Sequence, residues 1–250
     1  MKQKSYTKQF SALFCVLILL VLINISFGSV SIPFHEILDI LSGNNSSKSS
    51  WDLIILHFRL PKAITAILVG SGLAIAGLLM QTLFRNPLAG PFVLGISSGA
   101  SLGVALLILG SGIFGGVLAT IAFSSWGLAI ASSIGAALVL FAVLITANKV
   151  RNTMSILIIG LMFGTVTSAI ISVFTFFSNA DKIQQFVFWG FGSLGNLSWN
   201  EILVFFTIYL IAILNLICIT KPLNSLLIGE NYAKSLGINI KKNRNIILLI

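Results

Sequence analysis

The chain of 250 residues contains very little charge. Charged residues make up 8% of the sequence and hydrophobic residues 57%, and the mean hydropathy is +1.05. Soluble globular domains carry about 25% charged residues, so this composition excludes that class. The apolar runs reach the roughly 20 residues that a helix needs to cross a bilayer. The sequence therefore predicts an integral membrane protein.

Residues that build metal and catalytic centres are also scarce. The two cysteines, Cys15 and Cys218, lie far apart inside apolar runs, and the two histidines, His35 and His57, belong to no cluster with metal-ligand spacing. The six acidic residues form no evident pair of catalytic carboxylates and no Ser/His/Asp set. The sequence therefore predicts no metal, no cofactor and no catalytic residue, and disfavours a membrane-embedded enzyme or scaffold.

A phosphate-binding loop is absent as well. The glycine-containing stretch GSGLAIAG, residues 70–77, fits neither G-x-x-x-x-G-K-[ST] nor G-x-G-x-x-G, so ATP hydrolysis would need another protein. Its small residues have helical spacing and would instead let another helix approach closely. No charged residue lies in the middle of an apolar run, which argues against an ion-coupled secondary transporter, because that class carries intramembrane Asp, Glu or Arg.

The sequence is instead dominated by long apolar runs. The polar stretch between the first two, residues 30–61 with SGNNSSKSSWD, is predicted as a solvated outer loop. The fourth run is too long for one straight crossing, so it tilts or includes a re-entrant piece. The predicted fold class is all-α, a polytopic transmembrane bundle in a single domain over 1–250. The predicted spans are 10–29, 62–83, 92–110, 116–147, 154–177 and 199–220, with a seventh beginning near Asn245.

The few charges are divided unevenly between the two sides of the predicted membrane. With the amino terminus in the cytoplasm, most basic residues lie inside, and five of the six acidic residues lie outside. This asymmetry follows the positive-inside rule. It explains the net charge of +9 without nucleic-acid binding and predicts a multi-pass protein with its amino terminus in the cytoplasm. The cytoplasmic basic residues are Lys2, Lys4, Lys8, Arg85, Lys149, Arg151, Lys221, Lys234, Lys241, Lys242 and Arg244.

One stretch, LFRNPLAGPFVLGISSGAS at 83–101, interrupts two apolar runs with polar residues, prolines and glycines. Pro87 and Pro91 fix their own φ and push the residue before each of them out of helical geometry, so the chain is expected to turn there. We call residues 83–92 the signature turn. Beyond it, Gly95 and Gly99 lie among small residues that would let another helix backbone approach closely.

Residues 59–100, which contain this turn, resemble the signature of the FecCD family of ABC importer permeases. They share its RLP start, a small-residue helix ending in Gln81, an NPLA-P turn and an LG-S-GA helix start. FWGFGSLGNLSW, 188–199, is similar to the family's element before the sixth helix, and KPLNSLLIGENYAKSLGI, 221–238, looks like its coupling segment. The matched residues of the turn are Arg85, Asn86, Pro87, Leu88, Ala89, Pro91, Gly95 and Gly99.

The resemblance implies a permease subunit of a binding-protein-dependent importer in the inner (plasma) membrane, which is not itself an enzyme. The implied partners are a cytoplasmic ATP-binding subunit in two copies, a periplasmic or lipoprotein substrate-binding protein, a second permease copy and membrane lipid. An iron-siderophore cargo is expected on frequency alone, with haem and cobalamin as alternatives. Homodimer or heterodimer, and the organism, stay open. Family members have ten helices, so the chain is expected to be a fragment or a truncated form.

The resemblance also implies a role for the cytoplasmic residues 221–244, which we call the coupling segment. It is expected to form two short helices joined at a glycine, with Leu226, Leu227, Tyr232 and Leu236 entering a groove on the ATPase. The alternative is an interfacial helix held on anionic lipid by its lysines. The residues matched to coupling are Leu226, Leu227, Gly229, Glu230, Ala233, Leu236 and Gly237.

Two further sets of residues receive roles from the resemblance. Arg59 and Lys62 match basic positions that pair with acidic residues of the binding protein. Lys62 stands where arginine is usual and lacks its bidentate geometry, and interfacial anchoring is the alternative for both. Thr153, Met154 and Ser155 match a narrow cytoplasmic gate, in which Met154 partly replaces a polar pair.

Overall fold

The computed structural model describes residues 6–44, 46–111, 120, 124–150, 153–195 and 197–250. Every regular element within these ranges is helical, and five helices there are long and apolar enough to cross a membrane. The predicted all-α polytopic class is therefore confirmed. The five are α1 (Thr7–Ser26), the continuous helix Ser49–Phe84, α8 (Ser125–Lys149), α9 (Thr153–Phe176) and α11 (Trp199–Ile228).

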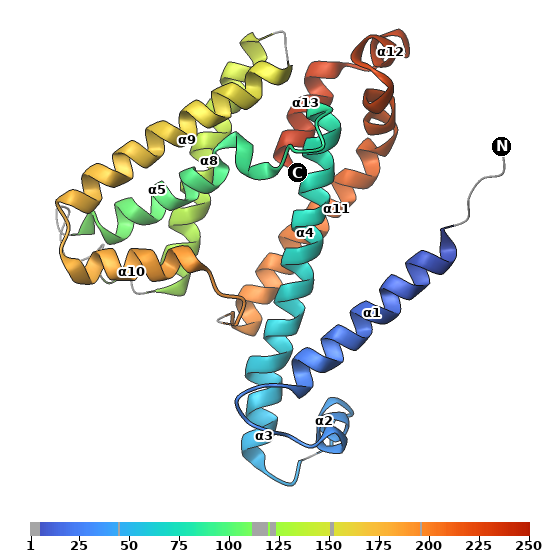
Figure 1. Ribbon diagram of the computed structural model, residues 1–250, viewed down its shortest axis with the longest axis vertical. Coiled ribbons are helices and arrows are strands. Elements are labelled where there is room, and N and C mark those ends of the chain that lie inside the picture. Colours follow the sequence, from blue (N-terminus) through green and yellow to red (C-terminus); the bar gives the residue numbers. More distant parts are fainter. Residues whose placement is uncertain (1–5, 45, 112–119, 121–123, 151–152, 196) are drawn as a thin grey trace. The chain divides into compact units, whose positions relative to one another are not determined.

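Shorter elements connect and extend these five helices (Figure 1). The continuous helix contains α3 (Ser49–Ile54), a π-helical turn η1 (Ile55–Arg59) and α4 (Leu60–Phe84). The predicted third span is a helix of only 13 residues, α5 (Ile96–Ile108), too short for a full crossing. The other elements are α2 (Phe34–Leu41), the 3₁₀ turn η2 (Pro91–Leu94), α10 (Ala180–Phe191), α12 (Glu230–Ser235) and α13 (Ile240–Leu249).

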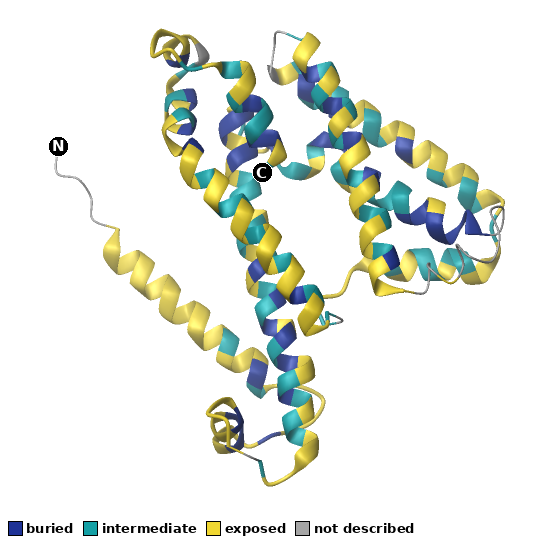
Figure 2. Cartoon of the chain, turned by 180° about the vertical axis from the view of Figure 1, so that it is seen from behind, coloured by how far each residue is buried: buried dark blue, intermediate teal, exposed yellow. Residues whose placement is uncertain are grey.

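The chain divides into two compact units. The first comprises Met1–Ser71 and Ser193–Tyr209, and the second comprises Gly72–Gly192 and Leu210–Ile250. Each unit has its own buried apolar residues. Many apolar side chains of α1, α9 and α11 are exposed, as the yellow ribbon of Figure 2 shows. Large exposed apolar surfaces mark contact with a membrane or a partner, in agreement with the predicted spans.

The first unit corrects the prediction of a solvated loop over 30–61. Most of this stretch is helical, because Ile37 and Ile40 of α2 recur at helical spacing and face a small core. The indole Nε1 of Trp199 donates to the Leu56 carbonyl at 3.0 Å and ties the start of α11 to η1. The buried core residues of this unit are Ile25, Ile32, Ile37, Ile40, Ile55 and Ala63.

In the second unit, α5 packs against α8 and α9 through glycines. A methyl group at Gly99 would lie 2.6 Å from the Gly135 carbonyl oxygen of α8, and one at Gly95 would lie 2.7 Å from the Gly160 carbonyl oxygen of α9. The close approach predicted for Gly95 and Gly99 is thus confirmed. At Gly70 and Gly77 of the stretch 70–77, by contrast, nothing described lies within 4 Å of an added methyl group, so the close approach predicted there is not seen at these two positions.

The carboxyl-terminal part of the second unit departs from the sequence prediction in two ways. The helix predicted over 199–220 continues to Ile228 although Pro222 lies inside it, so the first predicted short helix is the end of α11. The predicted seventh helix begins at Ile240, five residues before Asn245. In the fourth predicted span, α8 has 25 residues, enough for one crossing; the expected re-entrant piece falls on residues outside the described ranges.

A carboxylate in the first unit makes the stability of its local fold depend on pH. Glu36 accepts hydrogen bonds from the Ser47 hydroxyl and from the Ser47 backbone N–H, the latter at 3.0 Å. These bonds, with a smaller contribution from His35, hold the pKa of Glu36 below its ordinary value of 4.5. A carboxyl whose pKa is lowered by folding stabilises the fold above its unfolded value, and this contribution disappears as pH falls through the lowered pKa.

We therefore expect the link between α2 and the residues around Ser47 to open below about pH 4.5. Glu36→Gln should lose most of this protection already at neutral pH and remove its pH dependence. The measurement is the hydrogen-exchange protection factor of the Ser47 amide between pH 3 and 7. Ser47→Ala removes the hydroxyl alone, so its protection factor should lie between those of the unmodified chain and Glu36→Gln. Equal protection of the unmodified chain at both ends of the pH range would contradict the prediction.

Candidate functional site

The signature turn begins where α4 ends at Phe84. Arg85 adopts a φ of 48°, a left-handed conformation that is uncommon for a residue with a side chain. The Asn86 backbone N–H donates to the Gln81 carbonyl at 3.2 Å, and the Asn86 side-chain oxygen accepts from the Leu88 N–H at 2.9 Å. These bonds satisfy backbone groups left open at the helix end. The predicted turn is confirmed.

The second half of the turn leads into α5. Ala89 is buried, whereas the Leu88 side chain is 88% exposed. Pro91 opens η2, as expected for a residue that lacks a backbone N–H. Gly95 follows with a φ of 73° and precedes α5. Its positive φ and its contact with α9 both require a residue without a side chain, so the turn fixes where α5 starts.

The coupling segment consists of the end of α11, then α12, then the first half of α13. Gly229 separates α11 from α12 with a φ of 155°. Gly237, with a φ of 76°, ends α12: its N–H bonds the Lys234 carbonyl, and the Ile238 N–H bonds the Ala233 carbonyl at 3.0 Å. This pair of bonds is a Schellman motif. Both glycines are the breaks that the sequence predicts.

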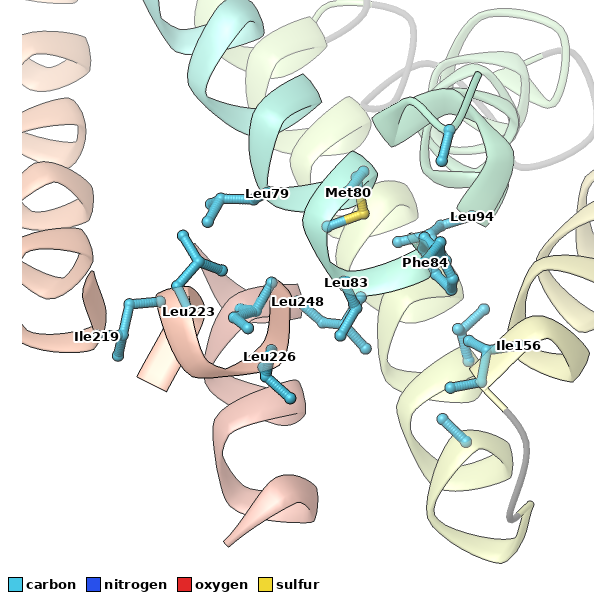
Figure 3. Packing of buried hydrophobic residues seen from close by; sticks show 14 of the residues in the cluster. Leu79, Met80, Leu83, Phe84, Leu94, Ile156, Ile219, Leu223, Leu226 and Leu248 are labelled. Atoms are coloured by element: carbon cyan, nitrogen blue, oxygen red, sulfur yellow. The ribbon is translucent and has the colours of Figure 1, made fainter. Parts of the chain in front are cut away.

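A buried apolar cluster fixes the coupling segment to α4, α8 and α9. Figure 3 shows Leu223 and Leu226 of α11 together with Leu83 of α4 and Leu248 of α13. Ala233 of α12 is fully buried in the same cluster. The cluster members are Leu79, Met80, Leu83, Phe84, Ala89, Leu94, Val139, Val143, Ala147, Ile156, Ile219, Leu223, Leu226, Ala233, Ile247 and Leu248.

The side chains predicted to reach the ATPase are therefore split between two faces. Leu226 is only 5% exposed, because it shares a helix face with Ile219 and Leu223, so the prediction that it is offered to a partner is wrong for this structure. Leu227, Tyr232 and Leu236 are exposed, as predicted. Ile228, which sequence reasoning missed, is exposed beside Leu227. The side chain of Glu230 lies outside the described part; its backbone begins α12.

The predicted gate residues lie at the amino-terminal end of α9. Thr153 is its first residue, and its side chain is outside the described part. Met154 is exposed and Ser155 half-buried, whereas Ile156 points into the apolar cluster (Figure 3). The structure thus places these residues next to the cluster that holds the coupling segment. Their role as a gate stays a prediction.

Two arginines contact helix ends that sequence reasoning did not connect with them. Arg85, predicted to lie on the cytoplasmic side, donates from Nε and Nη2 to the Leu226 carbonyl at 3.2 and 3.0 Å. Arg244 of α13 donates from Nη2 to the Ala147 carbonyl of α8 at 2.7 Å. The partners are 141 and 97 residues away in the chain. Nothing in the local sequence pattern indicates contacts at such separations.

The two residues predicted to dock the binding protein, Arg59 and Lys62, have different environments in the structure. Lys62 is exposed, but Arg59 is only 8% exposed. The Arg59 Nη1 donates to the Ile25 and Ser26 carbonyls at 2.7 and 2.8 Å, and its Nη2 donates to the Val30 carbonyl. Arg59 therefore binds the carboxyl-terminal end of α1, where unpaired carbonyls carry partial negative charge. The expectation that both cations face a partner is corrected for Arg59.

The described part of the chain holds no group of three or more His, Cys, Asp or Glu residues that could bind a metal ion. The site consists instead of a buried apolar cluster, a segment with exposed apolar side chains, and arginines bound to helix ends. Such a site can receive a partner surface and pass on a displacement.

Comparisons with known proteins agree with this picture. The chain is 32% identical over 240 residues to the vitamin B12 import system permease protein BtuC of Klebsiella pneumoniae subsp. pneumoniae, covering 95% of this chain and 66% of the relative. It is 33% identical over 200 residues to BtuC of Salmonella typhi, covering 79% and 58%. It thus spans about three fifths of these relatives. A solved structure described as an inward-facing metal-chelate type ABC transporter matches with a TM-score of 0.80, at 28% identity, over 97% of this chain and 72% of that one.

The family comparison covers most of the sequence. The model of the FecCD transport family matches residues 16–250. This range includes the signature turn, the predicted gate residues and the whole coupling segment, so the sites described above all lie within the match. The resemblance noted from the sequence is confirmed: the chain belongs to the FecCD transport family.

Proposed function

We propose that the chain is part of the membrane permease of a binding-protein-dependent ABC importer that carries a metal chelate into the cell. Family membership over residues 16–250 is the observation that carries this proposal. ATP hydrolysis is supplied by a separate cytoplasmic subunit, and the cargo is delivered by a separate binding protein. A second permease copy completes the pathway. Both copies lie in the inner membrane, and the amino terminus of each is in the cytoplasm.

The coupling segment supports this mechanism. Leu227, Tyr232 and Leu236 are exposed on a segment whose opposite face is buried in the apolar cluster. An amphipathic helix of this kind fits a hydrophobic groove on a partner. When the ATPase pair closes on ATP, it would displace the coupling segment, and the cluster would pass that displacement to α4, α8 and α9.

The proposed class of cargo includes three chelates. The relatives are named for vitamin B12 and the solved structure for a metal chelate, which supports a large chelated metal as cargo. The ferric siderophore expected from the sequence belongs to this class, as do haem and cobalamin, the latter now supported by the relatives' names. A bulky chelate is recognised mainly by the binding protein, so the permease residues alone do not distinguish these cargoes.

Of the two basic residues predicted to dock the binding protein, only Lys62 keeps that role in the proposal. The exposed Lys62 would contact acidic residues of the binding protein, and Arg59 would hold the neighbouring end of α1 in place. Charges at the rim of such an interface act mainly on association rate and specificity.

The proposal is tested by uptake in cells whose own permease is deleted. The gene containing this sequence is expressed with its neighbouring ATPase and binding protein, and labelled ferric siderophore, labelled haem and labelled cobalamin are supplied separately. We expect ATP-dependent accumulation of one of the three, and none when the ATPase carries a substitution in its phosphate-binding lysine. Accumulation that persists without ATP hydrolysis, or no accumulation of any of the three chelates, would refute the proposed function.

A further inference from the structure

Two arginines bind the two ends of the coupling segment to other parts of the second unit. At one end, the Leu226 carbonyl accepts from Nε and Nη2 of Arg85 at 3.2 and 3.0 Å. At the other end, Nη2 of Arg244 donates to the Ala147 carbonyl at 2.7 Å. One contact leads to the signature turn and the other to the end of α8, which precedes the predicted gate.

Both acceptor carbonyls lie in the last turn of a helix. Leu226 is two residues before the end of α11, and Ala147 is two residues before the end of α8. The last four carbonyls of a helix lack intrahelical donors and carry partial negative charge. The Ala147 carbonyl also accepts from the Val150 N–H at 3.3 Å, so the guanidinium of Arg244 is a further donor there. At both helix ends the guanidinium adds a compensating positive charge. The two contacts therefore use the same chemistry at the two ends of the segment.

The backbone around Arg85 shows that this contact is built into the turn. A φ of 48° costs energy for a residue with a side chain, and the hydrogen bonds of Asn86 hold the turn in this form. A methyl group at Gly229 would lie 3.1 Å from the Arg85 Nη2. The glycine that ends α11 thus leaves room for the guanidinium beside the Leu226 carbonyl.

Arg244 makes its contact in a buried environment. Its side chain is 4% exposed, and a buried cation requires hydrogen-bonded partners. The next residue, Asn245, donates from its side chain to the Asn148 side-chain oxygen at 3.3 Å. Together these bonds fasten α13 to the last turn of α8 at two successive positions.

We propose that Arg85 and Arg244 form a brace that transmits movement of the coupling segment to the signature turn and to the end of α8 at the same time. They are positioning residues, since neither needs to touch cargo or nucleotide. The inference rests on the proposed function, because it assumes that an ATPase moves the coupling segment. The buried cluster holds Leu223, Leu226 and Ala233 of the segment, and the arginines add contacts at the Leu226 carbonyl and at its last residue, Arg244.

The decisive variant is Arg85→Asn, because asparagine tolerates positive φ but is too short to reach the Leu226 carbonyl. Lys149→Asn is the matched control: it removes one positive charge from the same predicted side of the membrane at an exposed residue outside the brace. Arg244→Gln tests the other end. In liposomes containing the full-length permease, its ATPase and its binding protein, we measure ATP hydrolysed per chelate transported.

Arg85→Asn is expected to raise the amount of ATP hydrolysed per chelate transported about fivefold. This is the effect of losing a charge-assisted hydrogen bond at a partly exposed site. Arg244→Gln should raise it at least as much, and Lys149→Asn should leave it unchanged. Assembly of the complex should be unaffected in Arg85→Asn, which separates coupling from folding. Unchanged ratios in both arginine variants would overturn the brace.

A second measurement does not depend on transport. Spin labels are placed at the exposed residues Leu88 and Ile228, after Cys15 and Cys218 are replaced by serine, and the distance between the labels is recorded in the full-length protein. Arg85→Asn should shift this distance to longer values and broaden its distribution. Identical distributions with and without the arginine would contradict the brace. If the unmodified complex transports neither chelate, the proposed function fails while this measurement still decides on the contact.

Discussion

Gly135→Ala is expected to destabilise the protein by about 2 kcal/mol, although it adds a single methyl group. That methyl would lie 2.1 Å from the Gly99 carbonyl oxygen and 2.9 Å from the Gly103 backbone nitrogen. All of these neighbours are backbone atoms, which cannot move aside as a flexible side chain can, so α5 and α8 must separate. The measurement is the free energy of unfolding in detergent, followed by circular dichroism. Gly135→Val should reduce the yield of folded protein further.

Gly77→Ala provides the control for this prediction. It makes the same chemical change within a helix, but nothing among the described residues lies within 4 Å of the added methyl. Its effect should stay within about 0.5 kcal/mol, as for substitutions that disturb no packing. If the two alanine variants have equal stability, the contact between α5 and α8 is not as close as the structure shows.

Arg59→Met is expected to cost about 3 kcal/mol, because it removes the guanidinium donors from one buried and two partly buried carbonyls. Three carbonyls, those of Ile25, Ser26 and Val30, accept from the Arg59 guanidinium. Methionine fills a similar volume but donates nothing. The end of α1 should therefore detach from η1, which hydrogen exchange of the amides at 25–30 would detect as faster exchange.

Lys62→Met is the control, since it removes the same charge three residues later from an exposed position. It should leave the exchange of 25–30 unchanged and reduce only the association rate of the binding protein. Arg59→Met should both speed the exchange of 25–30 and reduce the association rate of the binding protein. A variant of Arg59 that weakens binding-protein association without faster exchange at the end of α1 would show that the guanidinium serves the partner and not the fold.

The sequence was sufficient for the long spans and for the signature turn. Hydropathy alone locates helices of about 20 residues, because the bilayer sets that length. Pro87 and Pro91 restrict the backbone locally, so the turn can be read without knowledge of any neighbour. Gly95 and Gly99 were identified as points of close approach for a similar reason: small residues in a polytopic bundle commonly lie at helix contacts.

The remaining errors arise where tertiary contacts override local signals. The helix α2 within 30–61 is too short to give a strong periodic signal, and it forms because Ile37 and Ile40 pack in a core. The sixth span was predicted to end at residue 220, yet α11 continues through Pro222 because the residues that flank this proline pack in the apolar cluster. Arg59 was expected at the surface, as charged residues usually are, and its partners lie about thirty residues earlier in the chain.

The glycine contacts of α5 bear on how many independent movements this part of the chain can make. Packed helices normally slide past one another through small rotamer changes in the side-chain layer between them. Between Gly99 and Gly135, and between Gly95 and Gly160, no such layer exists. We expect α5, α8 and α9 to translate and rotate as a single rigid part, so changes of shape must occur in the segments that join this part to the rest of the chain. The number of moving parts is then smaller than the number of helices.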